Sequence, residues 1–391
     1  MAAAPAAAPQ RPASSTTTIH AARLIDGRGQ TRQNATITVD GTKIVAIDDR
    51  GGPYTYDLGD VTLLPGLIDV HTHVDWHFQP NGLYGNRPGQ PRETPEQRDA
   101  AIAANLLATL EAGFTTVQNV GSAIDATFRS RIASGELPGP RLLTSLGQVS
   151  RGTPDELRTR VRERKAAGAD VIKVFASASI RSGGAPTMTQ EQLDAVCGEA
   201  RAQGLRTVVH AHAAEAILRV VKAGCTQVEH GAYASDEALA LMRDRGVYFD
   251  PNIGLVLQNY IENRDRFLGA GNYTDEGFAF MEKAVGIKGE MFKRALQSGV
   301  KMPLGTDAVA GAHGQNAREI IARVEEGQAP MAALIGATSL AADSLGLGKT
   351  IGTLAPGFEA DIIAVAGDPL TDIRQLRRVT FVLKSGTVQK R

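Results

Sequence analysis

Short apolar runs alternate with longer amphipathic stretches over most of this chain. The runs have the length of buried strands, and the stretches between them repeat apolar residues at helical spacing. The strand candidates are residues 66–71, 114–120, 141–147, 169–176, 205–212, 226–230, 247–251 and 301–307. Eight β segments separated by helices predict an α/β fold, a (β/α)8 barrel over residues 66–349. A doubly wound open sheet is the alternative, but no glycine-rich phosphate loop follows the first strand.

Polar residues mark where the helices of this region begin. Thr94 and Thr189 each open a capping box, in which a glutamine three residues later reaches back to the helix start. Thr153, followed by proline, opens a third helix. Ser235 opens a further helix that is expected to end at Gly246.

Both ends of the chain have a different pattern. Residues 16–65 and about 350–391 contain short β segments separated by glycine turns. We expect these two segments to form one small β-sandwich domain beside the barrel. Residues 1–15 are rich in alanine and proline and are predicted to be a disordered leader. The leader lacks the parts of an intact signal peptide but is similar to the linker behind a removed one, which favours a periplasmic or secreted protein over a cytoplasmic one.

Composition narrows the classes of partner. The chain has 391 residues, with 42 basic and 42 acidic side chains and no basic block. This balance argues against nucleic acid or an anionic membrane as the main partner, and no apolar run has the length of a membrane span. Cys197 and Cys225 carry no ligand spacing. We interpret them as two buried free thiols rather than as a disulfide, so they do not define the compartment.

Histidines gather where the predicted strands end. In a barrel of this kind the carboxyl ends of all strands share one face, where active sites are built. An aspartate ends the last strand and completes the group. The residues are His71, His73, His210, His212, His230 and Asp307. Separate structural histidines would be scattered along the chain, so this pattern indicates a metal site.

Lys173 lies in the middle of the apolar strand at residues 169–176. A desolvated ammonium is strongly disfavoured there, unless the side chain reaches the barrel rim. Beside a group of metal-directed histidines, a reactive neutral amine is the better interpretation. Such an amine combines with carbon dioxide to give a carbamate, an anion that can bridge two cations.

Five motifs together carry a family resemblance. They are, in order along the chain, PGLIDVHTH, VIKVFAS, VVHAHA, VEHG and LGTDA. The chain resembles the amidohydrolase superfamily, in particular its binuclear branch of imidazolonepropionase-like and Xaa-Pro-dipeptidase-like enzymes. The similarity covers nearly everything after residue 17, including the closing GTLAPGFEADIIAV.

The resemblance implies a centre of two divalent ions, with zinc expected and manganese or cobalt as substitutes. The more buried ion would be held by His71, His73 and Asp307, and the more exposed ion by His210 and His230. Carboxylated Lys173 and a hydroxide would bridge the pair. His212 projects to the same side of its strand as His210, and either contacts the substrate or is a structural histidine.

The implied reaction is hydrolysis of an amide-like C–N bond in a small molecule of the dipeptide or N-acyl amino acid type. Asp307 would transfer the proton to the leaving nitrogen. Tyr233 would donate to the oxyanion, or else only packs. Arg181 would pair with a substrate carboxylate, or else is an exposed loop residue. The further candidates for substrate contact are His313, His77 and Trp76.

Other functions stay open. A cyclic-amide or lactone hydrolase would use the same binuclear centre. A mononuclear imidazolonepropionase-like or deaminase-like enzyme is a second alternative, although deaminases carry a glutamate where this chain has Ala213. A scaffold without catalysis would be expected to lack several of the ligands. The resemblance also implies a homo-oligomer.

Overall fold

The computed structural model describes residues 16–86 and 91–391. The predicted leader, residues 1–15, lies outside the described residues. Among the described residues, the strands of the two chain ends form an eight-stranded sheet in the order β15-β14-β13-β5-β1-β2-β3, with β4 paired to β1. The strands are β1 (Thr17–Ile25), β2 (Thr31–Asp40), β3 (Lys43–Asp48), β4 (Tyr56–Asp57), β5 (Val61–Pro65), β13 (Ile362–Ala366), β14 (Val379–Lys384) and β15 (Thr387–Lys390).

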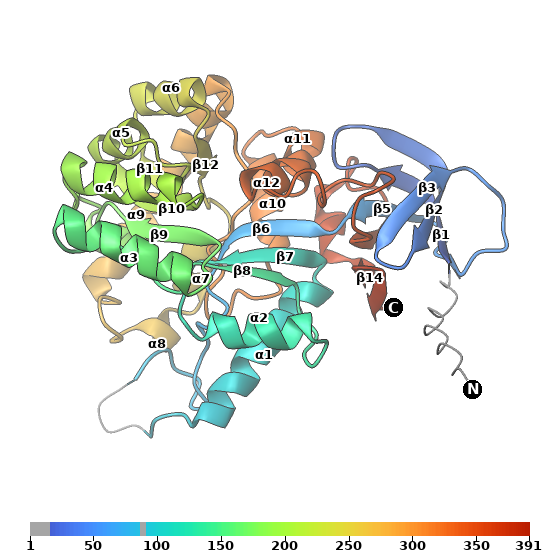
Figure 1. Ribbon diagram of the computed structural model, residues 1–391, viewed down its shortest axis with the longest axis horizontal. Coiled ribbons are helices and arrows are strands. Elements are labelled where there is room, and N and C mark those ends of the chain that lie inside the picture. The colour runs from blue at the N-terminus through green and yellow to red at the C-terminus, as the bar shows by residue number, and fades with distance from the viewer. Residues whose placement is uncertain (1–15, 87–90) are drawn as a thin grey trace, which may run out of the picture.

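This terminal sheet has its own core. Inward-facing residues of β1, β2, β5, β13 and β14 form one hydrophobic cluster. The ring of Tyr56 in β4 lies 5.4 Å from that of Phe381 in β14. The sheet therefore bends so that strands from opposite ends of the chain face each other, and Figure 1 shows them together at one side of the molecule. The domain boundaries at residues 65 and 350 stay predictions.

The middle of the chain supplies parallel strands. One sheet has the order β6-β7-β8 and the other the order β12-β11-β10-β9, and within both all pairs are parallel. The strands are β6 (Leu67–Thr72), β7 (Phe114–Asn119), β8 (Arg141–Thr144), β9 (Val171–Phe175), β10 (Arg206–Ala213), β11 (Gln227–Tyr233) and β12 (Tyr248–Asp250). A bridge between Gln148 and Lys173 joins the two sheets. The predicted α/β class is confirmed.

The last predicted strand, residues 301–307, is extended but is not a regular strand in the described structure. Its carbonyls accept hydrogen bonds on both sides, Leu304 from the N–H of Val70 in β6 and Lys301 from that of Phe249 in β12. Pro303 has no N–H to donate, which interrupts the ladder. The segment thus lies between β6 and β12, where the eighth strand of a barrel is expected.

Helices cover these strands (Figure 1). They are α1 (Pro95–Glu111), α2 (Asp125–Ala133), α3 (Pro154–Ala166), α4 (Gln190–Ala202), α5 (Ala214–Lys222), α6 (Asp236–Arg245), α7 (Val256–Glu262), α8 (Arg264–Phe267), α9 (Asp275–Ser298), α10 (Ala317–Glu325), α11 (Pro330–Gly336) and α12 (Ser339–Ser344), with 3-10 turns at Ile180–Ser182 and Ile373–Arg377. The predicted starts are confirmed: Thr94, Thr153 and Thr189 each form a complete capping box. The helix begun by Ser235 ends at Gly246, whose φ is positive. In the described ranges, none of the helices is both long and apolar enough for a bilayer.

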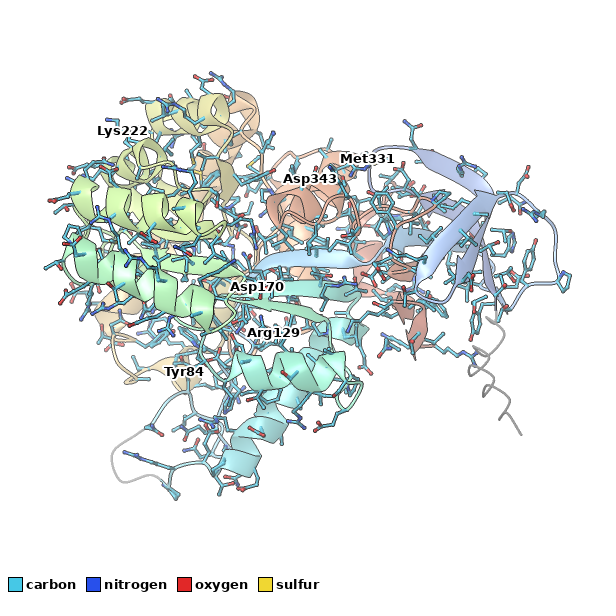
Figure 2. The ribbon with its side chains drawn as sticks, in the orientation of Figure 1. Tyr84, Arg129, Asp170, Lys222, Met331 and Asp343 are labelled. Carbon is cyan, nitrogen blue, oxygen red and sulfur yellow. A yellow bond between two sulfur atoms is a disulfide. The ribbon has the colours of Figure 1, made fainter. Side chains whose placement is uncertain are left out.

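Polar contacts attach the helices to the strands. The Arg129 guanidinium of α2 donates to Asp170 at 2.8 Å, and that carboxylate also accepts from the backbone N–H of Thr144 in β8. Figure 2 marks Arg129 and Asp170 on neighbouring elements. This ion pair fixes α2 over the start of β9.

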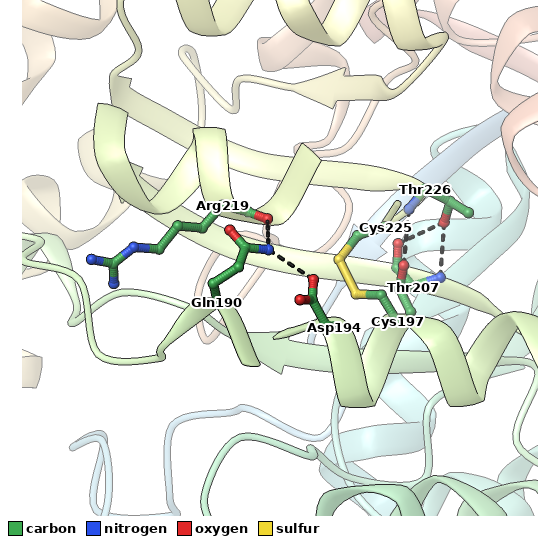
Figure 3. Close-up of a disulfide and its surroundings, with 7 residues drawn as sticks. All are labelled: Gln190, Asp194, Cys197, Thr207, Arg219, Cys225 and Thr226. Atoms are coloured by element: carbon green, nitrogen blue, oxygen red, sulfur yellow. Dashed lines mark hydrogen bonds between the residues drawn. A yellow bond between two sulfur atoms is a disulfide. The ribbon is translucent and has the colours of Figure 1, made fainter. Parts of the chain in front are cut away.

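The two cysteines correct the sequence analysis. Cys197 in α4 and Cys225, just before β11, form a disulfide with Cα atoms 5.1 Å apart (Figure 3). The prediction of two free thiols is wrong, because packing of α4 beside the α5–β11 turn brings together residues 28 positions apart. Gln190 strengthens the same contact by donating to the Arg219 carbonyl of α5.

Candidate metal centre

The histidines predicted from the strand ends lie together. His71 is in β6 and His73 directly after it, His210 and His212 are in β10, and His230 is in β11. The ring centroids of His71 and His230 are 5.3 Å apart, and those of His210 and His230 are 4.5 Å apart. All of these rings are buried. Three sequence segments thus bring imidazole nitrogens to one place, the condition for a metal site.

Lys173 lies beneath this group. It pairs with Val208 across β9 and β10, is 1% exposed, and places its Nζ 3.3 Å from Nε2 of His71. Burial lowers the pKa of Lys173. The sequence therefore puts a lysine whose neutral amine is favoured within reach of a candidate ligand, as carbamate formation requires.

Asp307 closes the group from the segment at residues 301–307. Its Oδ1 lies 3.2 Å from Nε2 of His73 and 3.6 Å from Nε2 of His71. Burial opposes ionisation of this carboxyl, but the charge of His71 and the hydrogen bond with His73 outweigh it and lower the pKa of Asp307. His71, His73 and Asp307 form a cluster with the spacing of a metal site.

Two of these residues have an uncommon backbone conformation. The φ of His230 is 69° and that of Asp307 is 52°. Side-chain-bearing residues rarely adopt positive φ, and such conformations concentrate at functional sites. Gly305 permits the close approach of the same segment, since a Cβ there would lie 2.0 Å from Oδ2 of Asp250 and 2.9 Å from Cβ of His71.

Two buried acids that no sequence pattern indicated, Glu229 and Asp69, position residues of the candidate centre. Oε2 of Glu229 accepts a hydrogen bond from Nδ1 of His71 at 2.6 Å, and Nε2 of the same ring faces Lys173 and Asp307. Asp69 accepts from the hydroxyl of Thr306 at 2.6 Å and from Asn316 at 2.7 Å, and so ties the last segment to β6. The alternation of side chains along a strand could have indicated Asp69, because Asp69 and His71 are two residues apart and share one face of their strand.

A cavity of about 100 Å³ lies above the cluster. Part of its wall is the candidate centre itself. The other lining residues are Trp76, Phe175, Ser179, Ile180, Arg181, His212, Val256, Leu257, Tyr260 and Lys288. Apolar and aromatic side chains dominate this wall, and two cations interrupt it.

Three of the predicted substrate residues line the cavity. Trp76 stacks on His73, with ring centroids 4.7 Å apart. His212 is 3% exposed, and within the described ranges its Nδ1 has no hydrogen-bond partner. Arg181 lies over the ring of Tyr273, 4.1 Å from the centroid, and its Nε donates to Asn272. Tyr260 and Lys288 line the same cavity, although no sequence motif indicated them.

The other three predicted residues lie elsewhere. His77 hydrogen-bonds with its Nε2 to Glu93 at 2.6 Å. His313 hydrogen-bonds to the Trp76 carbonyl at 3.1 Å and lines a separate surface hollow beside Arg318. Tyr233 ends β11. Among the described lining residues of the cavity none of these three is found, so their predicted contact with substrate has no support in this geometry.

The donor set fits divalent cations. Burial lowers the pKa of His210 to about 3 and that of His230 well below its ordinary value, so both imidazoles offer a lone pair at neutral pH. His73 keeps Nδ1 without a hydrogen-bond partner in the described structure. Neutral imidazoles beside one ionised carboxylate are the chemistry that zinc and similar ions prefer.

Comparisons with known proteins agree with this class of site. The sequence profile of the amidohydrolase family matches residues 62–390. The chain therefore belongs to the amidohydrolase family, and the predicted resemblance is confirmed. The family consists of hydrolases that act on small molecules, generally with divalent metal ions.

Several relatives are similar along nearly the whole chain. Ochratoxinase of Aspergillus niger is 27% identical over 428 residues, which cover 96% of this chain and 86% of that protein. The crystal structure of a Xaa-Pro dipeptidase with bound methionine has a TM-score of 0.85 and 31% identity, over 96% of this chain and 99% of that one. A prolidase complexed with N-methylphosphonate-L-proline has a TM-score of 0.85 and 25% identity, over 96% and 100%.

Proposed function

We propose that this protein is a binuclear metal-dependent amidohydrolase that hydrolyses an amide C–N bond in a dipeptide or N-acyl amino acid, on a closed (β/α)8 barrel. The observation that carries the proposal is the position of Lys173. This buried amine lies 3.3 Å from Nε2 of His71, below a cavity lined by histidines and Asp307. A single ion would not need a bridging lysine at that point.

Six side chains would hold the ions. His71, His73 and Asp307 would hold the inner ion, His210 and His230 the outer ion, and carboxylated Lys173 would bridge them. Zinc suits this set of imidazole and carboxylate donors. Divalent ions held there would supply Lewis acidity, which would polarise the scissile carbonyl and make hydroxide available from water at neutral pH.

The protein's own residues orient the substrate and move the proton. Asp307, held by His73 and by the backbone of β6, accepts the proton of the attacking water and delivers it to the leaving nitrogen. His212 lines the cavity with a nitrogen that has no partner among the described residues. It is better placed than Tyr233 to hydrogen-bond the developing oxyanion.

The cavity wall supports an acyl amino acid with an apolar side chain. Trp76, Phe175 and Tyr260 present aromatic rings to the cavity. Arg181 adds a guanidinium, whose pKa is raised: burial opposes the charge, but Tyr260 and Tyr273 outweigh it. The names of the relatives, a Xaa-Pro dipeptidase, a prolidase and an ochratoxinase, support amide hydrolysis as the reaction.

Metal content of the purified protein tests this proposal. We expect close to two divalent ions per chain in the wild type and about one or fewer in Lys173→Ala, with most activity lost on a panel of dipeptides and N-acyl amino acids. Lys165→Ala, an exposed lysine of α3, is the matched control and should keep both ions. One ion per chain together with full activity of Lys173→Ala would contradict the binuclear centre. Turnover of hydantoins or lactones instead of amides would favour the cyclic-substrate alternative.

We also propose that the protein works in an oxidising compartment, the periplasm or the exterior. The disulfide between Cys197 and Cys225 supports this location, because structural disulfides persist there and are rare in the reducing cytosol. Localisation by cell fractionation tests it, and a purely cytosolic protein with reduced thiols would contradict it. The homo-oligomer implied by the resemblance stays a prediction.

A further inference from the structure

Lys288 lies where a lysine is not expected. It belongs to the buried face of α9, in the apolar row that includes Met281, Ala284, Met291 and Phe292. The side chain is 2% exposed, so its ammonium does not reach bulk water. A buried cation is strongly unfavourable unless something nearby compensates for it.

The protein compensates for this charge only in part. Nζ of Lys288 donates one hydrogen bond of 2.6 Å to the carbonyl of Asn252. In the described part of the chain, no carboxylate oxygen lies within 4 Å of this ammonium. An ammonium has three N–H donors and no acceptor. Two of the donors therefore remain for a ligand.

Three carboxylates favour the charged form of Lys288, and two of them, Asp250 and Glu319, already have other partners; the third, Asp307, belongs to the candidate centre. Asp250 accepts from the backbone N–H of Gly305 at 3.0 Å, and Arg323 donates to the same carboxylate at 2.9 Å. Glu319 accepts from Arg323 and from the backbone N–H groups of two residues after β12. These acids have their partners without Lys288, so the lysine is not their counter-ion.

Lys288 faces the candidate centre instead. It lines the same cavity as the histidines and Asp307. The ammonium therefore belongs to the wall of the cavity that holds the candidate centre. Arg181, the other cation of the wall, packs on Tyr273 and donates with its Nε to Asn272.

We propose that Lys288 is a specificity-determining residue that binds the α-carboxylate next to the scissile nitrogen of the substrate. The inference rests on the proposed amidohydrolase function and names the part of the substrate that this cavity selects. An anion at this position accepts hydrogen bonds from the two remaining N–H donors of the ammonium. The site is dry, and a charge-assisted hydrogen bond is strong there. An α-carboxylate is two bonds from the scissile nitrogen, close enough to reach a cation beside the metal centre.

The test compares matched pairs of ligands and variants. Lys288→Met removes the charge at similar length, and Lys283→Met, an exposed lysine of the same helix, is the control. Release of benzoate is measured from N-benzoyl-L-phenylalanine and from N-benzoyl-L-phenylalaninamide. Calorimetry on the metal-loaded protein compares the binding of L-phenylalanine with that of L-phenylalaninol, which lacks the carboxylate. This measurement needs no turnover.

We expect the wild type and Lys283→Met to prefer both carboxylate ligands by at least ~30-fold, the loss typical of breaking a buried charge pair. Lys288→Met should lose this preference, mainly through a higher KM, while its rate on the amide changes by less than ~3-fold. Lys288→Arg should restore part of the preference. Equal losses on both substrates, or an unchanged preference in Lys288→Met, would overturn the inference.

The calorimetry separates this inference from the proposed function. Preference for L-phenylalanine over L-phenylalaninol that depends on Lys288, in a protein that cleaves no amide, would support the anion site and refute the hydrolysis. Amide hydrolysis without a carboxylate preference would support the proposed function and refute the anion site at Lys288. The melting temperature of Lys288→Met is recorded beside both measurements, and a folded variant that binds both ligands like the wild type contradicts the proposed role.

Discussion

Glu229 shows that the candidate centre depends on side chains that never face the cavity. It is fully buried, accepts from Nδ1 of His71 at 2.6 Å, and receives a second bond from Gln227 at 2.7 Å. Such partners fix the tautomer of a ligand histidine and increase its basicity. The residue immediately before a candidate ligand thus has a positioning role for another ligand 158 positions away.

Glu229→Gln should weaken metal binding. The amide keeps the shape of the side chain but loses the charge that favours the correct tautomer of His71, so affinity should fall ~10- to 100-fold. Competition with a chelator measures this, and circular dichroism checks the fold. Glu215→Gln, an exposed glutamate of α5 paired with Arg219, serves as the control. Equal metal affinity in both variants would mean that Glu229 does not position His71.

Among single residues, the sequence predicted those whose polar or charged side chains are unusual in an apolar strand. His71, His73 and Lys173 interrupt apolar strands, and this conflict made them visible. Glu229 and Lys288 were missed. A glutamate inside a strand or a lysine inside a helix is common at a solvent-facing position, and only the packing shows that these two are buried.

A covalent bond links α4 to the segment that follows α5. The disulfide from Cys197 to Cys225 joins α4 to the turn between α5 and β11. Thr207 and Thr226 exchange hydrogen bonds beside it, at the starts of β10 and β11. Figure 3 shows these bonds close to the sulfur atoms. The strands that carry His210 and His230 therefore begin from a fixed base.

Removing this disulfide should destabilise the protein without altering the site. Closing a loop of 28 residues lowers the entropy of the unfolded chain, and the loss in Cys197→Ala/Cys225→Ala should be ~3–4 kcal/mol. Denaturant unfolding with and without reductant measures it. The wild type should lose stability with reductant, whereas the double variant should not respond. An identical midpoint for oxidised and reduced wild type would contradict a stabilising disulfide.

Element boundaries were predictable where local chemistry defines them. Threonine caps before α1, α3 and α4 were read correctly, because a capping box needs only four consecutive residues. The irregular segment at residues 301–307 was predicted as a strand. Its apolar pattern has the right period, but Pro303 and the left-handed conformation of Asp307 break regular pairing.

In the whole molecule the two chain ends are joined to the parallel strands of the middle. Arg141 of β8 donates to the Asp361 carboxylate at 2.7 Å and to Thr116 of β7 at 2.8 Å. Asp361 directly precedes β13 and is 4% exposed. This ion pair spans 220 residues and connects the parallel strands to the terminal sheet.

Arg141→Met should loosen this connection. It leaves the Asp361 carboxylate buried with one remaining backbone donor, the N–H of Ser385. Because the arginine is partly exposed, we expect a loss of ~1–3 kcal/mol in unfolding free energy, below that of a fully buried pair. Chemical denaturation measures the change. Arg158→Met, which removes an exposed pair with Asp155, should change stability by less than ~0.5 kcal/mol. Equal effects of the two substitutions would show that Asp361 does not depend on Arg141.

The sequence by itself determined the order of strands and helices, the place of the ligand candidates at strand ends, and the family. These follow from local periodicity, capping and short motifs, which are properties of neighbouring residues. Only the tertiary structure decided which side chains share a buried volume. It paired Cys197 with Cys225, placed Lys288 and Tyr260 on the cavity wall and turned His77 and His313 to other partners. Burial and contact between distant segments depend on how the elements pack, and no local pattern encodes that packing.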